Sequence, residues 1–147
     1  MIYYCDEKDI LNLKDNNLIP VIPVNCKGVM GAGLALQFKN KYTTFYNEYV
    51  SACNSNEVEI GHILYLEEDN LKFILFPTKD DWKNVSKLEY IDKGLDNLLK
   101  FLNTFPTLNI AIPPLGCGCG KLSIEDVLPL IYNKLKDCKN DIFLIGF

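Results

Sequence analysis

Short apolar runs alternate along this chain with stretches of helical periodicity, and that alternation most constrains the fold. The apolar runs are rich in β-branched and aromatic residues, which is typical of strands. They are IYY (2–4), LIPVIPV (18–24), HILYL (62–66), KFILF (72–76), NIAI (109–112) and IFLIGF (142–147). Apolar residues recur at helical spacing over 34–49, 88–102 and 124–135, each predicted as one helix. Strands separated by helices predict an α/β fold, with a mostly parallel sheet covered by helices on both faces.

Two of the predicted helices carry start signals. Ser86 with Glu89, and Ser123 with Asp126, have the spacing of a capping box, in which a hydroxyl and an acid satisfy free N–H groups. Pro129 falls inside the third helix, where we expect it to bend or tighten an early turn.

Size and charge limit the classes of protein to consider. The 147 residues suit a single domain spanning 1–147. A net charge of -4 argues against binding of nucleic acid through the overall electrostatic field of the protein. Local groups of basic residues could still contact nucleic acid. No run approaches the ~20 apolar residues of a membrane span, and the start lacks signal-peptide features. These features predict a cytoplasmic protein that does not contact a membrane.

The cysteines do not form a recognisable metal pattern. There are 6 Cys without a CxxC pair, and His62 is the single histidine in the sequence. In a reducing compartment such cysteines are most simply buried thiols. We expect neither a metal nor a cofactor.

Three unusual loops follow predicted strands: NCKGVMGAG (25–33), PTKDDW (77–82) and PPLGCGCG (113–120). In parallel α/β sheets, ligands bind beyond the carboxyl ends of the strands. The three loops are therefore expected to converge on one cleft.

Glycines dominate two of these loops, each directly before a predicted helix. Glycine lets a ligand approach the backbone, and a helix N-terminus presents free N–H groups and partial positive charge. Two such loops favour an anion site suited to a diphosphate, although the glycines could simply form tight turns. GVMGAG does not match GxGxxG, and GCGCGKL lacks the Ser or Thr of a phosphate-binding loop, so neither a standard dehydrogenase nor a kinase is supported.

The segments VNCKGVMGAGLALQFKNKY, FPTKDDW and IPPLGCGCGKL, in that order, resemble a macro domain, the ADP-ribose-binding family. The similarity covers nearly the whole chain. It is most specific to the branch containing DarG-type DNA ADP-ribosyl glycohydrolase antitoxins and the terminal ADP-ribose glycohydrolases. It implies a three-layer α/β/α fold with a mixed, mostly parallel central sheet.

The resemblance also implies contacts with ADP-ribose. Asp9 would accept a hydrogen bond from the adenine amino group, and Ile10 would contact the ligand through its backbone. Asp9 could instead cap a turn. Asn25 would lie near the distal ribose, or could form an Asx turn at the strand end. The remaining implied contacts are Gly31, Ala32, Gly33, Leu34, Pro77, Thr78, Gly116, Cys117, Gly118, Cys119 and Gly120. We expect Cys117 to supply backbone and bulk, because His62 is distant in sequence from these loops and a nucleophilic thiol needs a nearby base.

Lys79 stands where the resemblance places a catalytic lysine. Beside a dry ribose pocket a lysine is partly desolvated, which favours a neutral amine able to attack an anomeric carbon. The amine could displace the leaving group directly or condense with the ring-opened aldehyde as an imine. Lys79 could instead be a phosphate anchor or a solvated loop lysine.

At one position this sequence differs from one of the two groups that it resembles. Terminal ADP-ribose glycohydrolases pair their lysine with an Asp in the second glycine loop, where this chain has Gly120. DarG-like proteins also lack that acid, so the resemblance favours removal of ADP-ribose from thymine in DNA. Trp82 could stack on a base while Lys83 and Lys87 meet phosphates, or the tryptophan could cover the core edge and the lysines form a solvated face.

Three functions stay open: a DNA ADP-ribosyl glycohydrolase using Lys79, a non-catalytic module that binds ADP-ribose, and a phosphatase acting on ADP-ribose 1''-phosphate. The expected partners are ADP-ribose or an ADP-ribosylated substrate, including ADP-ribosylated single-stranded DNA. A monomer is expected, because no predicted helix carries a coiled-coil seam.

Overall fold

The computed structural model describes residues 1–5, 10–12, 17–68 and 70–147. The elements in chain order are β1 (Ile2–Cys5), the 3-10 helix η1 (Ile10–Asn12), β2 (Leu18–Asn25), α1 (Gly33–Lys41), α2 (Thr43–Asn54), β3 (Leu64–Glu68), β4 (Leu71–Lys79), α3 (Leu88–Thr104), β5 (Asn109–Ile112), α4 (Ile124–Leu135) and β6 (Ile142–Ile145). Each predicted strand is present. Every helix within the described ranges is too short or too polar to cross a lipid bilayer.

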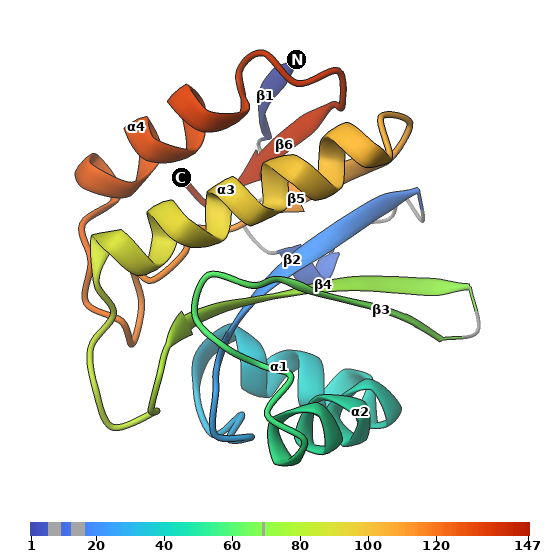
Figure 1. Cartoon of the computed structure of the whole chain (residues 1–147), viewed down its shortest axis with the longest axis vertical. Helices are drawn as coiled ribbons and strands as arrows, with labels where there is room; N and C mark the ends of the chain where they lie inside the picture. Colours follow the sequence, from blue (N-terminus) through green and yellow to red (C-terminus); the bar gives the residue numbers. More distant parts are fainter. Residues whose placement is uncertain (6–9, 13–16, 69) are drawn as a thin grey trace.

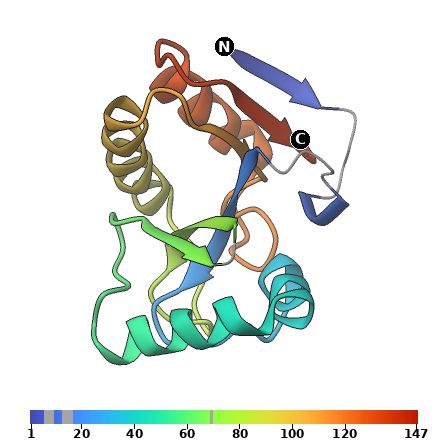
Figure 2. The same ribbon diagram turned by 90° about the vertical axis from the view of Figure 1, so that its right-hand side faces the viewer.

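The strands form one sheet in the order β1-β6-β5-β2-β4-β3 (Figure 1). Only the β3–β4 pair is antiparallel among the described pairings, and the other neighbours run parallel. Figure 2 shows β1 beside β6 at one edge. The predicted mixed, mostly parallel sheet is confirmed.

Helices cover both faces of the sheet, with α3 and α4 on one side and α1 and α2 on the other (Figures 1 and 2). Alternate residues of β4 enter the two cores, because successive side chains of a strand point to opposite faces. Phe76 belongs to the same core as Leu95 of α3, whereas Leu75 belongs to the other core, with Phe45 of α2. The three-layer α/β/α prediction is therefore confirmed.

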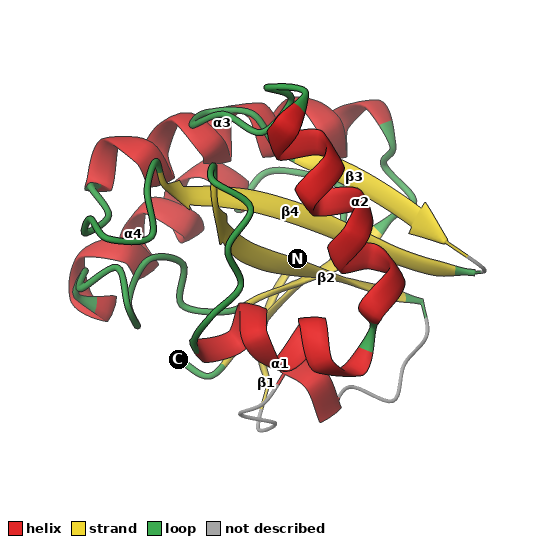
Figure 3. Cartoon of the chain, turned by 90° about the horizontal axis from the view of Figure 1, so that it is seen from below, coloured by secondary structure: helices red, strands yellow, loops and turns green. Residues whose placement is uncertain are grey.

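The first predicted helix is in fact two helices. The chain leaves helical geometry at Tyr42, with φ -130° and ψ 78°, so α1 and α2 run in different directions (Figure 3). This break brings three rings around Phe73, with centroid distances of 6.3 Å for Phe38, 5.4 Å for Tyr42 and 4.9 Å for Phe45. The prediction of one continuous helix over 34–49 was wrong because aromatic packing on the sheet sets the direction of each segment.

The two predicted helix starts have different outcomes. Ser123 caps α4, but its hydroxyl accepts from the Glu125 N–H at 3.2 Å, and not from the Asp126 N–H that a capping box requires. The prediction for Ser86 was wrong, because the N-cap of α3 is Lys87. The Ser86 hydroxyl is engaged elsewhere, as described below.

Pro129 lies inside α4, as its position in the sequence predicted. The helix continues past it to Leu135.

Candidate functional site

A cavity of about 740 Å³ opens where β2, β4 and β5 end. Its walls come from all three unusual loops and from the first residues of α1 and α4. The lining residues are Pro23, Val24, Asn25, Val29, Gly31, Ala32, Gly33, Leu34, Ala35, Thr78, Lys79, Trp82, Pro113, Pro114, Gly116, Cys117, Gly118, Cys119, Gly120 and Ile124. The predicted convergence of the three loops on one cleft is confirmed.

Most residues expected to contact a ligand line this cavity, but four do not. Pro77 is buried within β4, and Lys83 and Lys87 are exposed outside the cavity wall. Ile10 lines an adjoining cavity of about 370 Å³, which shares Leu34, Pro113 and Pro114 with the larger one. Asp9 lies outside the described residues.

Asn25 organises the first glycine loop through its side chain. Its Oδ1 accepts from the backbone N–H of Lys27 at 2.9 Å and lies 2.9 Å from the hydroxyl oxygen of Tyr49. Its Nδ2 donates to the backbone oxygen of Val29 at 2.6 Å. The Asx turn considered from the sequence is therefore present, and much of the amide's hydrogen-bonding capacity is used within the loop.

The N-termini of α1 and α4 differ in their capacity to bind an anion. The N-cap of α1 is Ala32, which has no side-chain cap, and its first turn contains no acidic residue. At α4, the Ser123 hydroxyl already accepts one N–H, and Glu125 and Asp126 offset the positive end of the helix. The N–H groups at the start of α1 are therefore the better position for a diphosphate, whereas the sequence suggested that both loops contribute to the site.

The second glycine loop leaves no room for a side chain at Gly120. A Cβ at Gly120 would lie 2.5 Å from the carbonyl oxygen of Gly116 and 2.9 Å from the Cβ of Ser86. Both distances are below ordinary van der Waals contact, so an Asp cannot occupy position 120 without moving the loop. Lys79 therefore has no carboxylate partner from this position.

The two glycine loops face each other across the cavity. Gly33 adopts φ +61°, in the left-handed region that favours glycine, and a Cβ there would lie 3.8 Å from the Cys119 Sγ. The gap between the loops is thus bounded by backbone on one side and an exposed thiol on the other.

Lys79 is half-buried at the end of β4 and lines the cavity. Its Nζ donates to the backbone oxygen of Trp82 at 3.3 Å, in an exposed hydrogen bond. The dry surroundings expected from the sequence are therefore not supplied by the protein alone. A bound sugar would have to exclude water from the amine.

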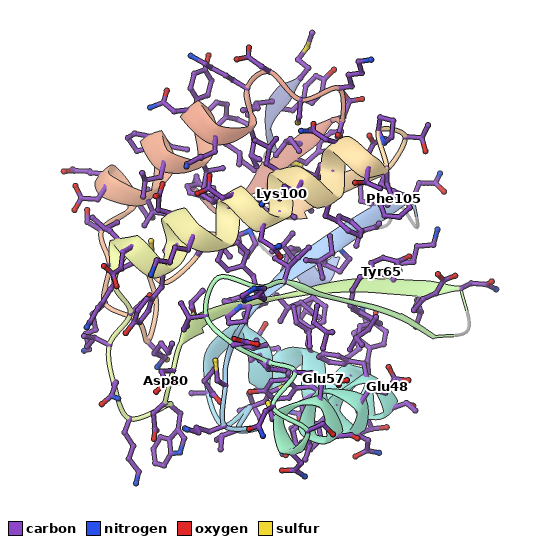
Figure 4. All side chains as sticks on the ribbon, in the orientation of Figure 1. Glu48, Glu57, Tyr65, Asp80, Lys100 and Phe105 are labelled. Atoms are coloured by element: carbon purple, nitrogen blue, oxygen red, sulfur yellow. The ribbon has the colours of Figure 1, made fainter. Side chains whose placement is uncertain are left out.

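The loop after Lys79 is held in a defined conformation. The side chain of Asp81 accepts from the Lys83 N–H at 3.0 Å, and its backbone oxygen accepts from the Asn84 N–H at 3.0 Å. The backbone oxygen of Asp80 accepts from the Cys26 N–H at 3.2 Å, which joins this loop to the first glycine loop. In Figure 4, Asp80 marks the position of this loop, and Lys100 on α3 lies at a distance from it.

Few ionisable groups reach the cavity. Among its described lining residues there is no Asp, Glu or His, and Lys79 is the only cation. Burial raises the pKa of the Cys117 thiol, which lies 3.5 Å from the backbone oxygen of Leu115. His62 is exposed and lies 3.9 Å from a carboxylate oxygen of Glu59, so it does not line the cavity as a base for a thiol.

Within the part of the chain that the structure describes, no three His, Cys, Asp or Glu side chains are grouped so that they could hold a metal ion.

The sequence reading missed Tyr49 and Ser86, which shape the site from outside the cavity wall. Tyr49 was counted only as one of the apolar residues of a helix. A signal was available, because a tyrosine predicted to be buried needs a hydrogen-bond partner for its hydroxyl. Ser86 was assigned to helix capping, and nothing in its local sequence indicates otherwise.

Comparisons with known proteins agree with this architecture. The family model described as Macro domain matches residues 21–131. The chain belongs to the macro domain family.

A curated Mycobacterium tuberculosis protein named DNA ADP-ribosyl glycohydrolase is 44% identical over 108 residues, covering 71% of this chain and 31% of the relative. The chain spans about a third of the length of the curated relatives it matches.

Two solved structures are similar over nearly all of the chain. The macrodomain of Mycobacterium tuberculosis DarG superimposes with a TM-score of 0.83 at 38% identity, covering 97% of both chains. Thermosipho africanus DarTG in complex with ADP-ribose gives a TM-score of 0.82 at 30% identity, covering 97% of this chain and 41% of that one.

Proposed function

We propose that this protein is an ADP-ribosyl glycohydrolase that removes mono-ADP-ribose, from thymine in DNA, by means of Lys79. The observation that carries the proposal is the position of Lys79 as the only cation among the described residues lining a cavity between two glycine loops. Relatives named DNA ADP-ribosyl glycohydrolase, and a relative's structure in complex with ADP-ribose, support it.

The diphosphate would lie at the start of α1, against Gly31, Ala32 and Gly33. Backbone N–H groups there carry partial positive charge that no acidic residue of the first turn offsets. Gly116 to Gly120 would form the facing wall, and the adenosine would extend toward Leu34 and Ile10 in the adjoining cavity. This orientation leaves the distal ribose near Asn25, Thr78 and Lys79.

Lys79 would act as the nucleophile. Once the sugar excludes water, the neutral amine attacks the anomeric carbon, and the bond from that carbon to the thymine nitrogen breaks. The thymine leaves with the bonding electrons and takes up a proton, and water then releases ADP-ribose and restores the amine. Condensation of the amine with the ring-opened aldehyde is the other route that this placement allows.

Contacts with DNA would come from the loop after β4. Trp82 is 50% exposed at the cavity wall, where its ring could stack on a base. Lys83 and Lys87 lie nearby in sequence and are exposed, with Nζ atoms 5.4 Å from the Trp82 ring and 5.6 Å from the Tyr90 ring, respectively. These two lysines would supply the local attraction that an acidic protein otherwise lacks.

We further propose that the chain acts as a monomeric single domain in the cytoplasm, as the de-ADP-ribosylating part of an antitoxin. Similarity to DarG macrodomains supports this setting.

Hydrolysis of a defined substrate tests the proposal. A single-stranded oligonucleotide carrying ADP-ribose on one thymine is incubated with the wild type and with Lys79→Ala, and released ADP-ribose is measured. Lys79→Ala should lower the rate by about 100-fold or more while ADP-ribose affinity, measured by calorimetry, is retained. Lys72→Ala, at the opposite end of β4, is the matched control.

The other candidate functions give different results. Binding of ADP-ribose without turnover of modified DNA or protein by the wild type would indicate a binding module. Phosphate release from ADP-ribose 1''-phosphate at a comparable rate would support the phosphatase. Full turnover by Lys79→Ala would overturn the role of the lysine.

A further inference from the structure

Ser86 connects the strand that carries Lys79 to the second glycine loop. Its hydroxyl donates to the backbone oxygen of Thr78, the residue directly before Lys79. Its backbone N–H donates to the backbone oxygen of Gly120 at 2.9 Å. One buried residue, 4% exposed, therefore joins both walls of the cavity.

The side chain of Ser86 also packs directly against the glycines of this loop. A Cβ at Gly116 would lie 3.1 Å from the Ser86 Oγ, and a Cβ at Gly120 would lie 2.9 Å from the Ser86 Cβ. A Cβ at Gly120 would also lie 2.5 Å from the Gly116 oxygen, which accepts from the Leu122 N–H at 2.9 Å within the same turn. The serine and the loop are thus fitted to each other.

The hydroxyl is not needed to start the following helix. The N-cap of α3 is Lys87, so Ser86 lies one residue before the cap. A hydroxyl in this buried position that bonds to a strand instead of its own helix requires another explanation.

We propose that Ser86 is a positioning residue, which sets the distance between the Lys79 amine and the second glycine loop, the wall that faces the diphosphate held at the start of α1. The inference rests on the proposed function, since it concerns the alignment of Lys79 with the anomeric carbon. The Ser86 hydroxyl bonds to the strand residue Thr78 and its backbone N–H bonds to the loop residue Gly120. Removal of the hydroxyl breaks the bond to Thr78 and leaves the bond to Gly120, so Ser86 no longer links the strand to the loop. The ligand would still bind to the loops, but the amine would no longer be held at the reacting carbon.

The test separates turnover from binding. Ser86→Ala should lower kcat on the ADP-ribosylated oligonucleotide by about 10- to 100-fold, because a misplacement near 1 Å can cost about 100-fold in rate. The affinity for free ADP-ribose, measured by calorimetry, should change by less than about threefold, since loss of positioning acts on kcat more than on binding. Thr104→Ala is the matched control, because its hydroxyl donates to a backbone oxygen, that of Lys100, at 2.9 Å on the exposed end of α3.

Each outcome decides between the alternatives. A wild type that binds ADP-ribose but does not release it from DNA or protein would overturn the proposed function and this inference together. An active wild type with unchanged kcat in Ser86→Ala would overturn the inference alone. An equal loss of kcat and affinity would also overturn it, because Ser86 would then only maintain the loop.

If Ser86→Ala does not fold, Ser86→Cys provides the same comparison, because its thiol is a weaker donor in the same place. A lower kcat with retained affinity supports the inference, and an unchanged kcat contradicts it.

Discussion

The hydroxyl of Tyr49 donates to the backbone oxygen of Asn25 at 2.8 Å and lies 2.9 Å from the Oδ1 of the same residue. Tyr49 is fully buried in α2, whereas Asn25 is the last residue of β2. A helix on one face of the sheet therefore fixes the residue that shapes the first glycine loop. Burial also raises the pKa of the Tyr49 hydroxyl, so it remains a neutral donor at physiological pH.

Tyr49→Phe should weaken ADP-ribose binding and lower stability. Removal of the hydroxyl leaves the buried oxygens of Asn25 without this donor, which costs about 1–3 kcal/mol of unfolding free energy. Without this hydrogen bond the first glycine loop is held less firmly, so the affinity for ADP-ribose should fall about 3- to 10-fold. A loss of about 1.4 kcal/mol in binding free energy corresponds to a tenfold loss of affinity. Calorimetry and urea unfolding measure the two effects, with Tyr46→Phe, half-buried on the same helix, as the control. Unchanged affinity in Tyr49→Phe would show that the Asn25 loop does not depend on this bond.

Gly120→Ala should destabilise the protein by about 1–3 kcal/mol, because the added methyl collides with the Gly116 oxygen. Gly118→Ala is the matched control, since a Cβ there has nothing within 4 Å and should change stability by less than about 0.5 kcal/mol. Denaturant unfolding distinguishes the two variants. Equal stability of both would contradict the steric explanation for the absence of a side chain at position 120.

Cys119 should react with a thiol reagent before Cys26. Burial, with smaller contributions from Asp80 and Cys53, raises the pKa of Cys26 from its ordinary value of 9.0 to about 11. At pH 8 its thiolate fraction is therefore about 100-fold lower than that of an unperturbed thiol. Labelling of Cys26 should therefore increase as the pH rises toward 11. Cys119 is exposed on the cavity wall, and ADP-ribose should protect it.

Peptide mass spectrometry after timed alkylation with iodoacetamide measures both thiol reactions. Faster labelling of Cys26 than of Cys119 at pH 8 would contradict the order. Labelling of Cys119 that ADP-ribose does not slow would place the ligand away from the second glycine loop.

Lys83→Ala combined with Lys87→Ala should reduce the salt dependence of binding to ADP-ribosylated single-stranded DNA. Each phosphate contact that is lost reduces the slope of log affinity against log salt by about 0.7 for a single strand. Affinity measured by fluorescence anisotropy across a salt series gives this slope, with Lys100→Ala, an exposed lysine of α3 (Figure 4), as the control. An unchanged slope in the double variant would remove these lysines from the proposed DNA contact.

Much of the candidate site was predictable from the sequence. Glycine-rich segments after apolar runs, together with Lys79 between them, were expected at one edge of the sheet. Parallel strands bring their carboxyl ends to the same edge, so the order of segments was enough to predict that the loops meet. The contacts of Tyr49 and Ser86 were not predictable in this way, because their partners lie in other elements and local spacing carries no information about them.

The sequence by itself determined the alternation of strands and helices, the six strands and the three loops, because hydrophobic periodicity and glycine act locally. Tertiary structure decided where the first helix breaks at Tyr42, which helix N-terminus is free to receive an anion, and what the Ser86 hydroxyl bonds to. Each of these depends on packing between residues from different elements: rings around Phe73, loops across the cavity, and a serine between a strand and a turn. Such contacts exist only after the chain has folded, since they bring together groups that are separate in the sequence.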